Sequence, residues 1–177
     1  MATLRSLLAL ALFGVFLTTP GLAAGRPKIA ILSTDFVLAR KFQQMQDIAR
    51  QQDVEVVYVR VDDASPADIR QALDGADFIL LDMPRQEDQA LIERMAGEQI
   101  RACKVPTLSV MNYSPARWMA GVGLEADAVR TLYDYYANGS HTNVTRMLEY
   151  VKRRILNVER GDVRPPVLLP AVGIWHP

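Results

Sequence analysis

The segment PKIAILSTD (residues 27–35) decides the fold, because it is a short apolar run that ends in small polar side chains. An uninterrupted apolar run of this length is typical of a strand that is buried on both faces of a parallel sheet. Three later segments have the same character: DVEVVYVRVDD (53–63), DFILLDMP (77–84) and VPTLSVMN (105–112). The sequence therefore predicts about four strands of one sheet.

Helical segments separate these strands. Apolar residues recur at helical spacing in residues 37–52 and 85–103. Between them, SPADIRQALDGA (65–76) offers Ser65 as a helix N-cap and Pro66 at the first helical position. Strands that alternate with helices through short connections predict a parallel sheet with helices on both faces. We expect an α/β fold of the Rossmann or flavodoxin-like type, followed by a C-terminal helical segment and an extended tail.

The pattern changes after the fourth expected strand. A loop rich in Pro and Gly precedes a helix expected from about Glu125 to Tyr136. HTNVTRMLEYVKRRIL (141–156) has one apolar stripe and predicts a second helix. The polar residues that follow are typical of a hinge. We therefore expect an α/β domain over residues 25–157 and a linker over residues 158–177.

The N-terminus has the order of a secretory signal peptide. Its only basic residue is Arg5, which is followed by an apolar run from Leu7 to Leu17 and then by small residues. This run is shorter than the ~20 residues that a membrane-spanning helix needs. We expect residues 1–24 to be a signal peptide and the protein to be periplasmic. An uncleaved N-terminal membrane anchor is the alternative.

Composition and motifs exclude several classes of function. The chain has 20 Lys and Arg residues and 20 Asp and Glu residues, which argues against a nucleic-acid partner. Its one cysteine, Cys103, leaves no internal disulfide. Cys103, His141 and His176 do not have the spacing of a metal site. The sequence also lacks glycine-rich phosphate loops and a GxSxG elbow, so we assign no catalytic residue.

Polar side chains follow the expected strands. Ligands of open parallel sheets bind outside the carboxyl ends of the strands, so these side chains predict a small-ligand cleft. They are Ser33, Thr34, Asp35, Asp62, Asp63, Asp82, Asn112 and Tyr113. Asp and Ser after a strand are also ordinary caps of the next helix, and this alternative applies to Asp35, Asp62 and Asp63.

Two asparagines match the N-glycosylation sequon. Asn138-Gly139-Ser140 and Asn143-Val144-Thr145 both fit the pattern. Asn143 falls in the first turn of an expected helix, where local hydrogen bonding of the side chain explains it better.

Two C-terminal segments resemble a known family. LYDYYANGSHTNVTRMLEYVKRRIL (132–156) and PPVLLPAVGIWHP (165–177) are similar to segments of CobN, the large subunit of aerobic cobaltochelatase, and of the related magnesium-chelatase H subunit. In that family an aromatic-rich helix is followed by a Gly, an Asn, an amphipathic helix and a GIYHP segment. The matching positions here are Gly139, Asn143, Gly173, Ile174, His176 and Pro177. Trp175 stands where the family usually has Tyr.

The resemblance implies a function. In that family the large subunit binds a tetrapyrrole and a divalent metal (Co, Mg or Fe), and AAA+ ATPase partners drive metal insertion. The family protein is far longer, and its GIYHP segment leads into the next domain. The resemblance therefore implies a fragment or a truncated reading frame whose partner is the remainder of the large subunit. Export argues against the ATPase partners, because the periplasm has no ATP pool. It favours metal or metallo-tetrapyrrole handling or uptake.

We predict ligand-binding residues from the strand ends and from the resemblance together. They are Asp35, Asn112, Tyr113, Asn143, Trp175 and His176. His176 is also the predicted metal-handling residue. We expect Tyr133 and Tyr136 to be core and rim of a helix, because residues three apart share a face. The fragment is expected to be inactive alone and to carry no cofactor of its own. The alternatives are a stand-alone, non-enzymatic tetrapyrrole or metal carrier and an unrelated α/β domain.

Overall fold

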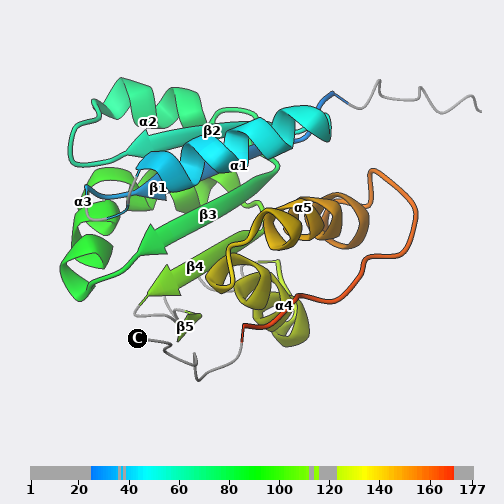
Figure 1. The fold of residues 1–177 in the computed structure, drawn as a ribbon. Helices are drawn as coiled ribbons and strands as arrows, with labels where there is room; N and C mark the ends of the chain where they lie inside the picture. The colour runs from blue at the N-terminus through cyan, green and yellow to red at the C-terminus, as the bar shows by residue number, and fades with distance from the viewer. Residues whose placement is uncertain (1–24, 36, 38, 112–113, 116–122, 170–177) are drawn as a thin grey trace, which may run out of the picture.

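The protein folds as one sheet with helices on both faces (Figure 1). The computed structural model describes residues 25–35, 37, 39–111, 114–115 and 123–169. The strands are β1 (Lys28–Ser33), β2 (Glu55–Arg60), β3 (Phe78–Met83), β4 (Thr107–Met111) and β5 (Ser114–Pro115). They lie in the order β2-β1-β3-β4-β5, with β5 antiparallel to β4 and the other pairs parallel. The predicted α/β fold with about four parallel strands is confirmed.

The helices divide between the two faces of the sheet. They are α1 (Ala39–Gln51), α2 (Pro66–Leu73), α3 (Gln86–Cys103), α4 (Ala126–Ala137), α5 (His141–Tyr150) and the π-helical segment η1 (Val151–Ile155). Side chains of α1, α4 and α5 form one core with the sheet, and side chains of α2 and α3 form the other. This arrangement explains why the inner strands β1 and β3 are buried along nearly their whole length, since both of their faces are covered.

Strand β1 shows how one run of sequence serves both cores. Ile29 and Ile31 belong to the core under α1, whereas Ala30 and Leu32 belong to the core under α3. Successive side chains of a strand point to opposite faces, so each residue is buried on one side or the other. Full burial of a side chain such as Leu32 contributes about 1.5–3 kcal/mol to the stability of the fold, relative to leaving the side chain exposed.

Helix α2 begins at the predicted N-cap. Ser65 Oγ accepts a hydrogen bond from the Asp68 amide at 3.2 Å, and the Asp68 carboxylate accepts one from the Ser65 amide at 2.9 Å. This reciprocal pair is a capping box, with Pro66 at the start of the helix. Hydrogen bonds from Ser65 lower the pKa of Asp68. Ser65, rather than Asp62 or Asp63, therefore caps this helix.

The helix predicted over residues 141–156 is present but widens at its end. The α-helix α5 ends at Tyr150, and in η1 the Leu156 amide donates to the Val151 carbonyl at 2.8 Å. Within this wider turn, Lys152 Nζ donates to the Gln52 carbonyl at 3.1 Å. The end of the second C-terminal helix is thereby joined to the end of α1.

Residues 158–169, called here the tail, lie along α5 and α4 without forming a helix or strand (Figure 1). The Tyr135 hydroxyl donates to the Arg164 carbonyl at 2.5 Å. Arg146 Nη1 donates to the Pro165 carbonyl at 2.6 Å. Side chains of the two helices therefore bind the backbone of the tail.

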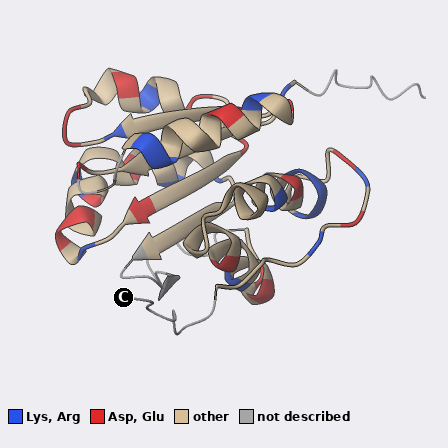
Figure 2. Ribbon diagram, in the orientation of Figure 1, with Lys and Arg blue, Asp and Glu red and all other residues tan. Residues whose placement is uncertain are grey.

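The described surface carries charges of both signs. Lys and Arg residues are interspersed with Asp and Glu residues over the ribbon (Figure 2). Within the described ranges, no helix has the length and apolar character that crossing a membrane requires.

Candidate functional site

The candidate site lies where the strand order reverses. The chain runs from β1 to its neighbour β2 and then returns to β3 on the other side of β1, so the switch point falls between β1 and β3. At the carboxyl ends of these strands Ser33 and Asp82 are partners in register. Crevices at such switch points are the usual ligand sites of open α/β sheets.

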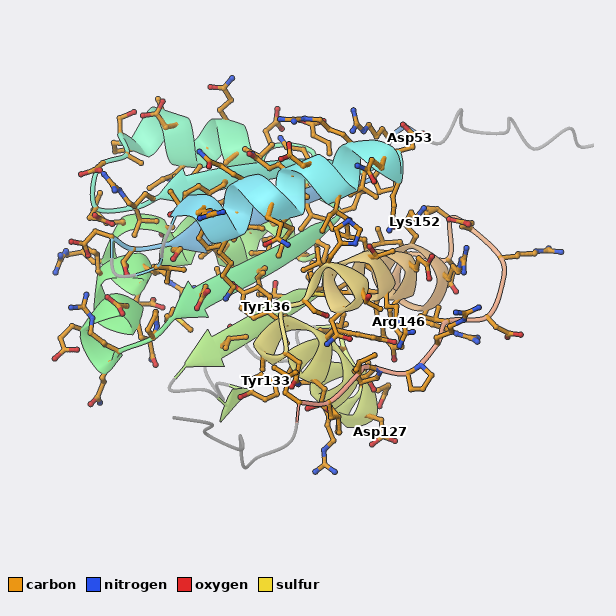
Figure 3. The ribbon with its side chains drawn as sticks, in the orientation of Figure 1. Asp53, Asp127, Tyr133, Tyr136, Arg146 and Lys152 are labelled. Carbon is orange, nitrogen blue, oxygen red and sulfur yellow. The ribbon has the colours of Figure 1, made fainter. Side chains whose placement is uncertain are left out.

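Asp82 is the centre of a cluster of three residues, the Asp82 cluster. Asp82 is 5% exposed, and its Oδ2 accepts hydrogen bonds from the Tyr136 hydroxyl and from Lys41 Nζ, the latter at 3.2 Å. Lys41 Nζ also lies 3.7 Å from the centroid of the Tyr136 ring. Figure 3 labels Tyr136 on α4, where this helix faces the sheet. A strand and two helices thus bring a carboxylate, an ammonium and a phenol together.

Tyr136 is a fixed donor in this cluster. Burial raises its pKa well above the ordinary value, and the charge of Asp82 and the hydrogen bond to it raise it further. The hydroxyl therefore stays protonated at physiological pH and donates permanently to Asp82. Tyr136 cannot act as a general base, but it holds the carboxylate in one orientation.

One oxygen of Asp82 is left open. Among the described residues, no hydrogen-bond donor reaches Oδ1. Lys41 is the accessible member of the cluster, with 39% of its side chain exposed. The cluster therefore offers one acceptor and spare ammonium protons to a ligand that approaches the switch point.

Tyr58 extends this polar group toward β2. Its ring stacks on Phe42, with centroids 4.0 Å apart. Its hydroxyl is buried and makes no hydrogen bond of ordinary geometry with the described residues. Burial raises the pKa of Tyr58, and nearby Arg60 partly opposes this. Like Tyr136, it is a protonated donor near the carboxyl ends of the strands.

On the face of the sheet that α3 covers, a buried salt bridge lies at the carboxyl end of β1. Asp88, 1% exposed, accepts from Thr34 Oγ1 at 3.0 Å and from Arg85 Nη2 at 2.6 Å. Burial alone would raise the pKa of Asp88, but the hydrogen bonds from Arg85 and Thr34 outweigh it and lower the pKa. Asp88 is therefore ionised and ties the start of α3 to the end of β1.

The structure places two of the six predicted ligand-binding residues. Asp35 is exposed at the carboxyl end of β1, 3.8 Å from Arg85, as its position in the sequence predicts. Asn143 lies at the corner between α4 and α5, and its amide binds the backbone of Asn138 and Val167. Asn112, Tyr113, Trp175 and His176 lie outside the described residues. Ligand binding by all six stays a prediction.

Sequence reasoning missed Lys41 and set Tyr136 aside as a core residue. Tyr136 is indeed in the core, but its hydroxyl binds Asp82. The sequence does contain a feature that could have identified Lys41. It lies four residues before the buried Met45 and so falls on the apolar side of α1. A lysine in that position needs a carboxylate, and Asp82 follows a buried run of β3.

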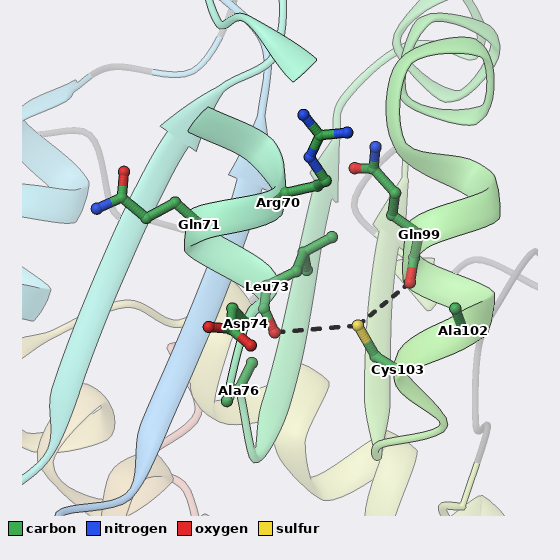
Figure 4. A pocket seen from close by; sticks show the side chains of 9 residues that line it. Arg70, Gln71, Leu73, Asp74, Ala76, Gln99, Ala102 and Cys103 are labelled. Atoms are coloured by element: carbon green, nitrogen blue, oxygen red, sulfur yellow. Dashed lines mark hydrogen bonds between the residues drawn. The ribbon is translucent and has the colours of Figure 1, made fainter. Parts of the chain in front are cut away.

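A cavity lies at the opposite end of the sheet. It measures about 770 Å³ and lies between the ends of α2 and α3 (Figure 4). Cys103 Sγ donates to the Gln99 carbonyl at 3.2 Å, and burial, with a smaller contribution from Asp74, raises the pKa of this thiol. The thiol is therefore protonated at physiological pH.

The described residues provide no preformed metal centre. Nowhere in the described ranges do three His, Cys, Asp or Glu side chains gather closely enough to hold a metal ion. Contact of a metal with His176 is therefore a prediction about a residue outside these ranges.

One comparison with known proteins is informative. No family model matches the sequence, and no curated protein matches it. Among solved structures, the catalytic subunit of cobaltochelatase from Mycobacterium tuberculosis has a similar fold, with a TM-score of 0.57 and 16% identity. The match covers 85% of this chain and 12% of that chain. At this identity the likeness shows the fold alone, and it agrees with the expected CobN-like character only at that level.

Proposed function

We propose that this protein is the N-terminal portion of a CobN-like large subunit and that it takes part in handling a metal or metallo-tetrapyrrole outside the cytoplasm. The observation that carries the proposal is the likeness to a cobaltochelatase subunit over 85% of this chain. Similarity of residues 132–156 and 165–177 to CobN-type segments, reached from the sequence independently, supports it. The metal and the macrocycle are cargo in this role.

The geometry of the switch point supports binding rather than catalysis. The Asp82 cluster supplies a carboxylate, an ammonium and a phenol that is held protonated by burial. Lys41 and Asp82 can hold and orient the polar edge of a macrocycle, while Tyr136 keeps the Asp82 carboxylate in one orientation. Because Tyr136 does not release its proton at physiological pH, the cluster has no evident general base beside the carboxylate itself.

Absorbance spectroscopy tests the proposal. The purified protein is titrated with heme and with a cobalt corrinoid, while circular dichroism verifies that it is folded. We expect at least one of these ligands to show a shifted absorbance band that saturates at micromolar concentration. A folded protein that shifts neither spectrum would contradict the proposal.

A pair of histidine variants tests the predicted metal contact. His176→Ala is expected to alter the axial-ligand bands of the bound metallo-tetrapyrrole. His141→Ala is the matched control, because His141 is exposed at the start of α5. Identical spectra for His176→Ala and the unmodified protein would remove His176 from the proposal.

Export is tested separately. Residues 1–30 are fused to alkaline phosphatase, which is active only after transfer to the periplasm. We expect an active fusion, and a second fusion that lacks residues 7–17 should be inactive. An inactive full-length leader would contradict the periplasmic role.

A further inference from the structure

We propose that Asn138 is a deamidation site, that the docked tail restrains its reaction, and that the products of the reaction release the tail. Asn138 is followed by Gly139. The side chain of asparagine cyclises most readily before glycine, because glycine has no Cβ to hinder the attack. This dipeptide lies at the corner between α4 and α5, where the tail is bound. The site is separate from the Asp82 cluster and does not require the proposed function.

The reaction needs only these two residues and water. The Gly139 nitrogen forms a bond to Cγ of Asn138, the bond between Cγ and Nδ2 breaks, and the Gly139 amide proton leaves with Nδ2 as ammonia. Water then opens the resulting succinimide ring at one of its two carbonyl carbons. Opening at Cγ gives aspartate, and opening at the former main-chain carbonyl gives isoaspartate.

The attacking nitrogen is free to react. Gly139 is exposed, and within the described ranges its amide donates no hydrogen bond. Such an amide can lose its proton to hydroxide and attack the neighbouring side chain. The other sequon asparagine, Asn143, is followed by Val144, which is β-branched and donates its amide to the Ser140 carbonyl at 2.9 Å. The structure therefore favours the reaction at Asn138 and not at Asn143.

The docked tail restrains the carbon that is attacked. Ring closure needs the Gly139 nitrogen on the same side of the Cα–C bond of Asn138 as Cβ, and at the observed ψ of 23° it lies on the opposite side. Rotation about this bond moves the Asn138 carbonyl, which accepts from Asn143 Nδ2 at 3.0 Å. The side chain is held as well, because its Oδ1 accepts from the Leu169 amide at 2.9 Å. Deamidation should therefore be slow while the tail is docked and faster once it detaches.

The products cannot hold the tail in the same way. In isoaspartate the main chain gains one carbon, and the carbonyl that binds Asn143 becomes part of a free carboxylate. In aspartate a carboxylate oxygen replaces Nδ2, which donates to the Asp134 carbonyl at 2.8 Å, so two acceptors face each other. Both products therefore weaken the corner that binds Val167 and Leu169.

Mass spectrometry of the purified full chain tests the reaction. The protein is incubated at mildly alkaline pH, and the peptide that contains Asn138 is followed for deamidation and for isoaspartate. Asn143→Ala, which loosens the tail, should react at least about tenfold faster than the parent protein. A factor of ten corresponds to about 1.4 kcal/mol in the opening of the tail, which is the scale of two hydrogen bonds. Gly139→Ala should suppress the reaction, and its new Cβ meets only the Tyr136 carbonyl, at 3.4 Å.

A second pair of variants separates opening of the tail from loss of overall stability. Leu80→Ala destabilises the centre of the sheet without touching the tail and should react at close to the parent rate. Should Asn143→Ala fail to fold, Arg146→Gln takes its place, because it removes only the bond to the Pro165 carbonyl, and it should react several-fold faster than the parent. A parent rate in the folded tail variant, or an equal acceleration in Leu80→Ala, would overturn the restraint by the tail. Undiminished reaction in Gly139→Ala would overturn the assigned site.

Hydrogen exchange tests the effect of the modification on the tail. Deamidation adds a negative charge, so ion-exchange chromatography separates the modified parent protein from the unmodified protein. The Val167 and Leu169 amides should exchange much faster in the modified fraction, whereas amides of β1 should be unchanged. Equal exchange in the two fractions would overturn the release of the tail.

Discussion

The amide of Asn143 should hold the tail against the α4–α5 corner, and this can be tested by removing it. Asn143 is 1% exposed, and its Nδ2 donates to the Asn138 carbonyl at 3.0 Å and to the Val167 carbonyl at 2.8 Å. Its Oδ1 accepts from the Val167 amide at 2.8 Å. Asn143→Ala therefore removes three hydrogen bonds at once, two of which hold the tail.

The expected cost follows from these bonds. Each contributes about 0.5–1.5 kcal/mol net, and the freed groups of Val167 can be hydrated once the tail detaches. We expect a loss of about 2–3 kcal/mol in the free energy of unfolding. For a domain of this size that corresponds to a fall of about 5–10 °C in Tm.

Thermal unfolding and amide hydrogen exchange measure the two consequences of Asn143→Ala. The Val167 and Leu169 amides, which bind Asn143 and Asn138, should exchange much faster in the variant, whereas amides of β1 should change little. Thr142→Ala, at an exposed neighbouring position in α5, is the control and should leave Tm unchanged. A Tm within 1 °C of the parent protein, with slow exchange retained at Val167, would refute this reasoning.

Three other substitutions test the packing of the fold. Asp88 has a lowered pKa, so its contribution to the free energy of unfolding is present above the unfolded pKa of about 4 and is lost as pH falls through the folded value. Asp88→Asn should therefore be less stable than the parent protein at pH 7. In urea titrations it should also lose less stability than the parent protein on acidification. Gly97→Ala should stabilise α3 by a few tenths of a kcal/mol, because the gain of about 1 kcal/mol in helix propensity is partly offset by the new Cβ, which displaces the Glu93 carboxylate. In the Glu93→Ala background this clash is gone, so Gly97→Ala should be more stabilising there. Equal effects of Gly97→Ala in the two backgrounds would contradict the predicted clash. Leu80→Ala, at the centre of the sheet, should cost about 2–5 kcal/mol in chemical denaturation, and a loss below 1 kcal/mol would contradict the observed packing.

The sequence predicted the sheet well because both of its faces are buried. The runs in β1 and β3 are apolar along their length, and helices with one apolar face fall between them. The short strand β5 was not predicted, because it has two residues and includes Pro115, which is a weak strand signal. The π-helical turn at Val151 was missed because the apolar stripe continues through it without interruption.

The candidate site was only partly predictable. The rule for parallel sheets brought Ser33 and Asp82 to the correct edge, because it depends on strand direction alone. The partners of Asp82 come from α1 and α4, and their arrival depends on how these helices pack on the sheet. Periodicity assigns a residue to a face but does not choose its partner across the core, which is why Lys41 and the hydroxyl of Tyr136 were missed.

The central claim is that a metallo-tetrapyrrole binds this protein at the carboxyl end of the sheet, and chemical-shift mapping with a diamagnetic cobalt corrinoid tests it most directly. The account predicts that saturable shift changes concentrate on the backbone amides around Ser33, Lys41, Asp82 and Tyr136. Shift changes confined to the opposite cavity around Arg70 and Cys103, or no changes at saturating ligand, would contradict it.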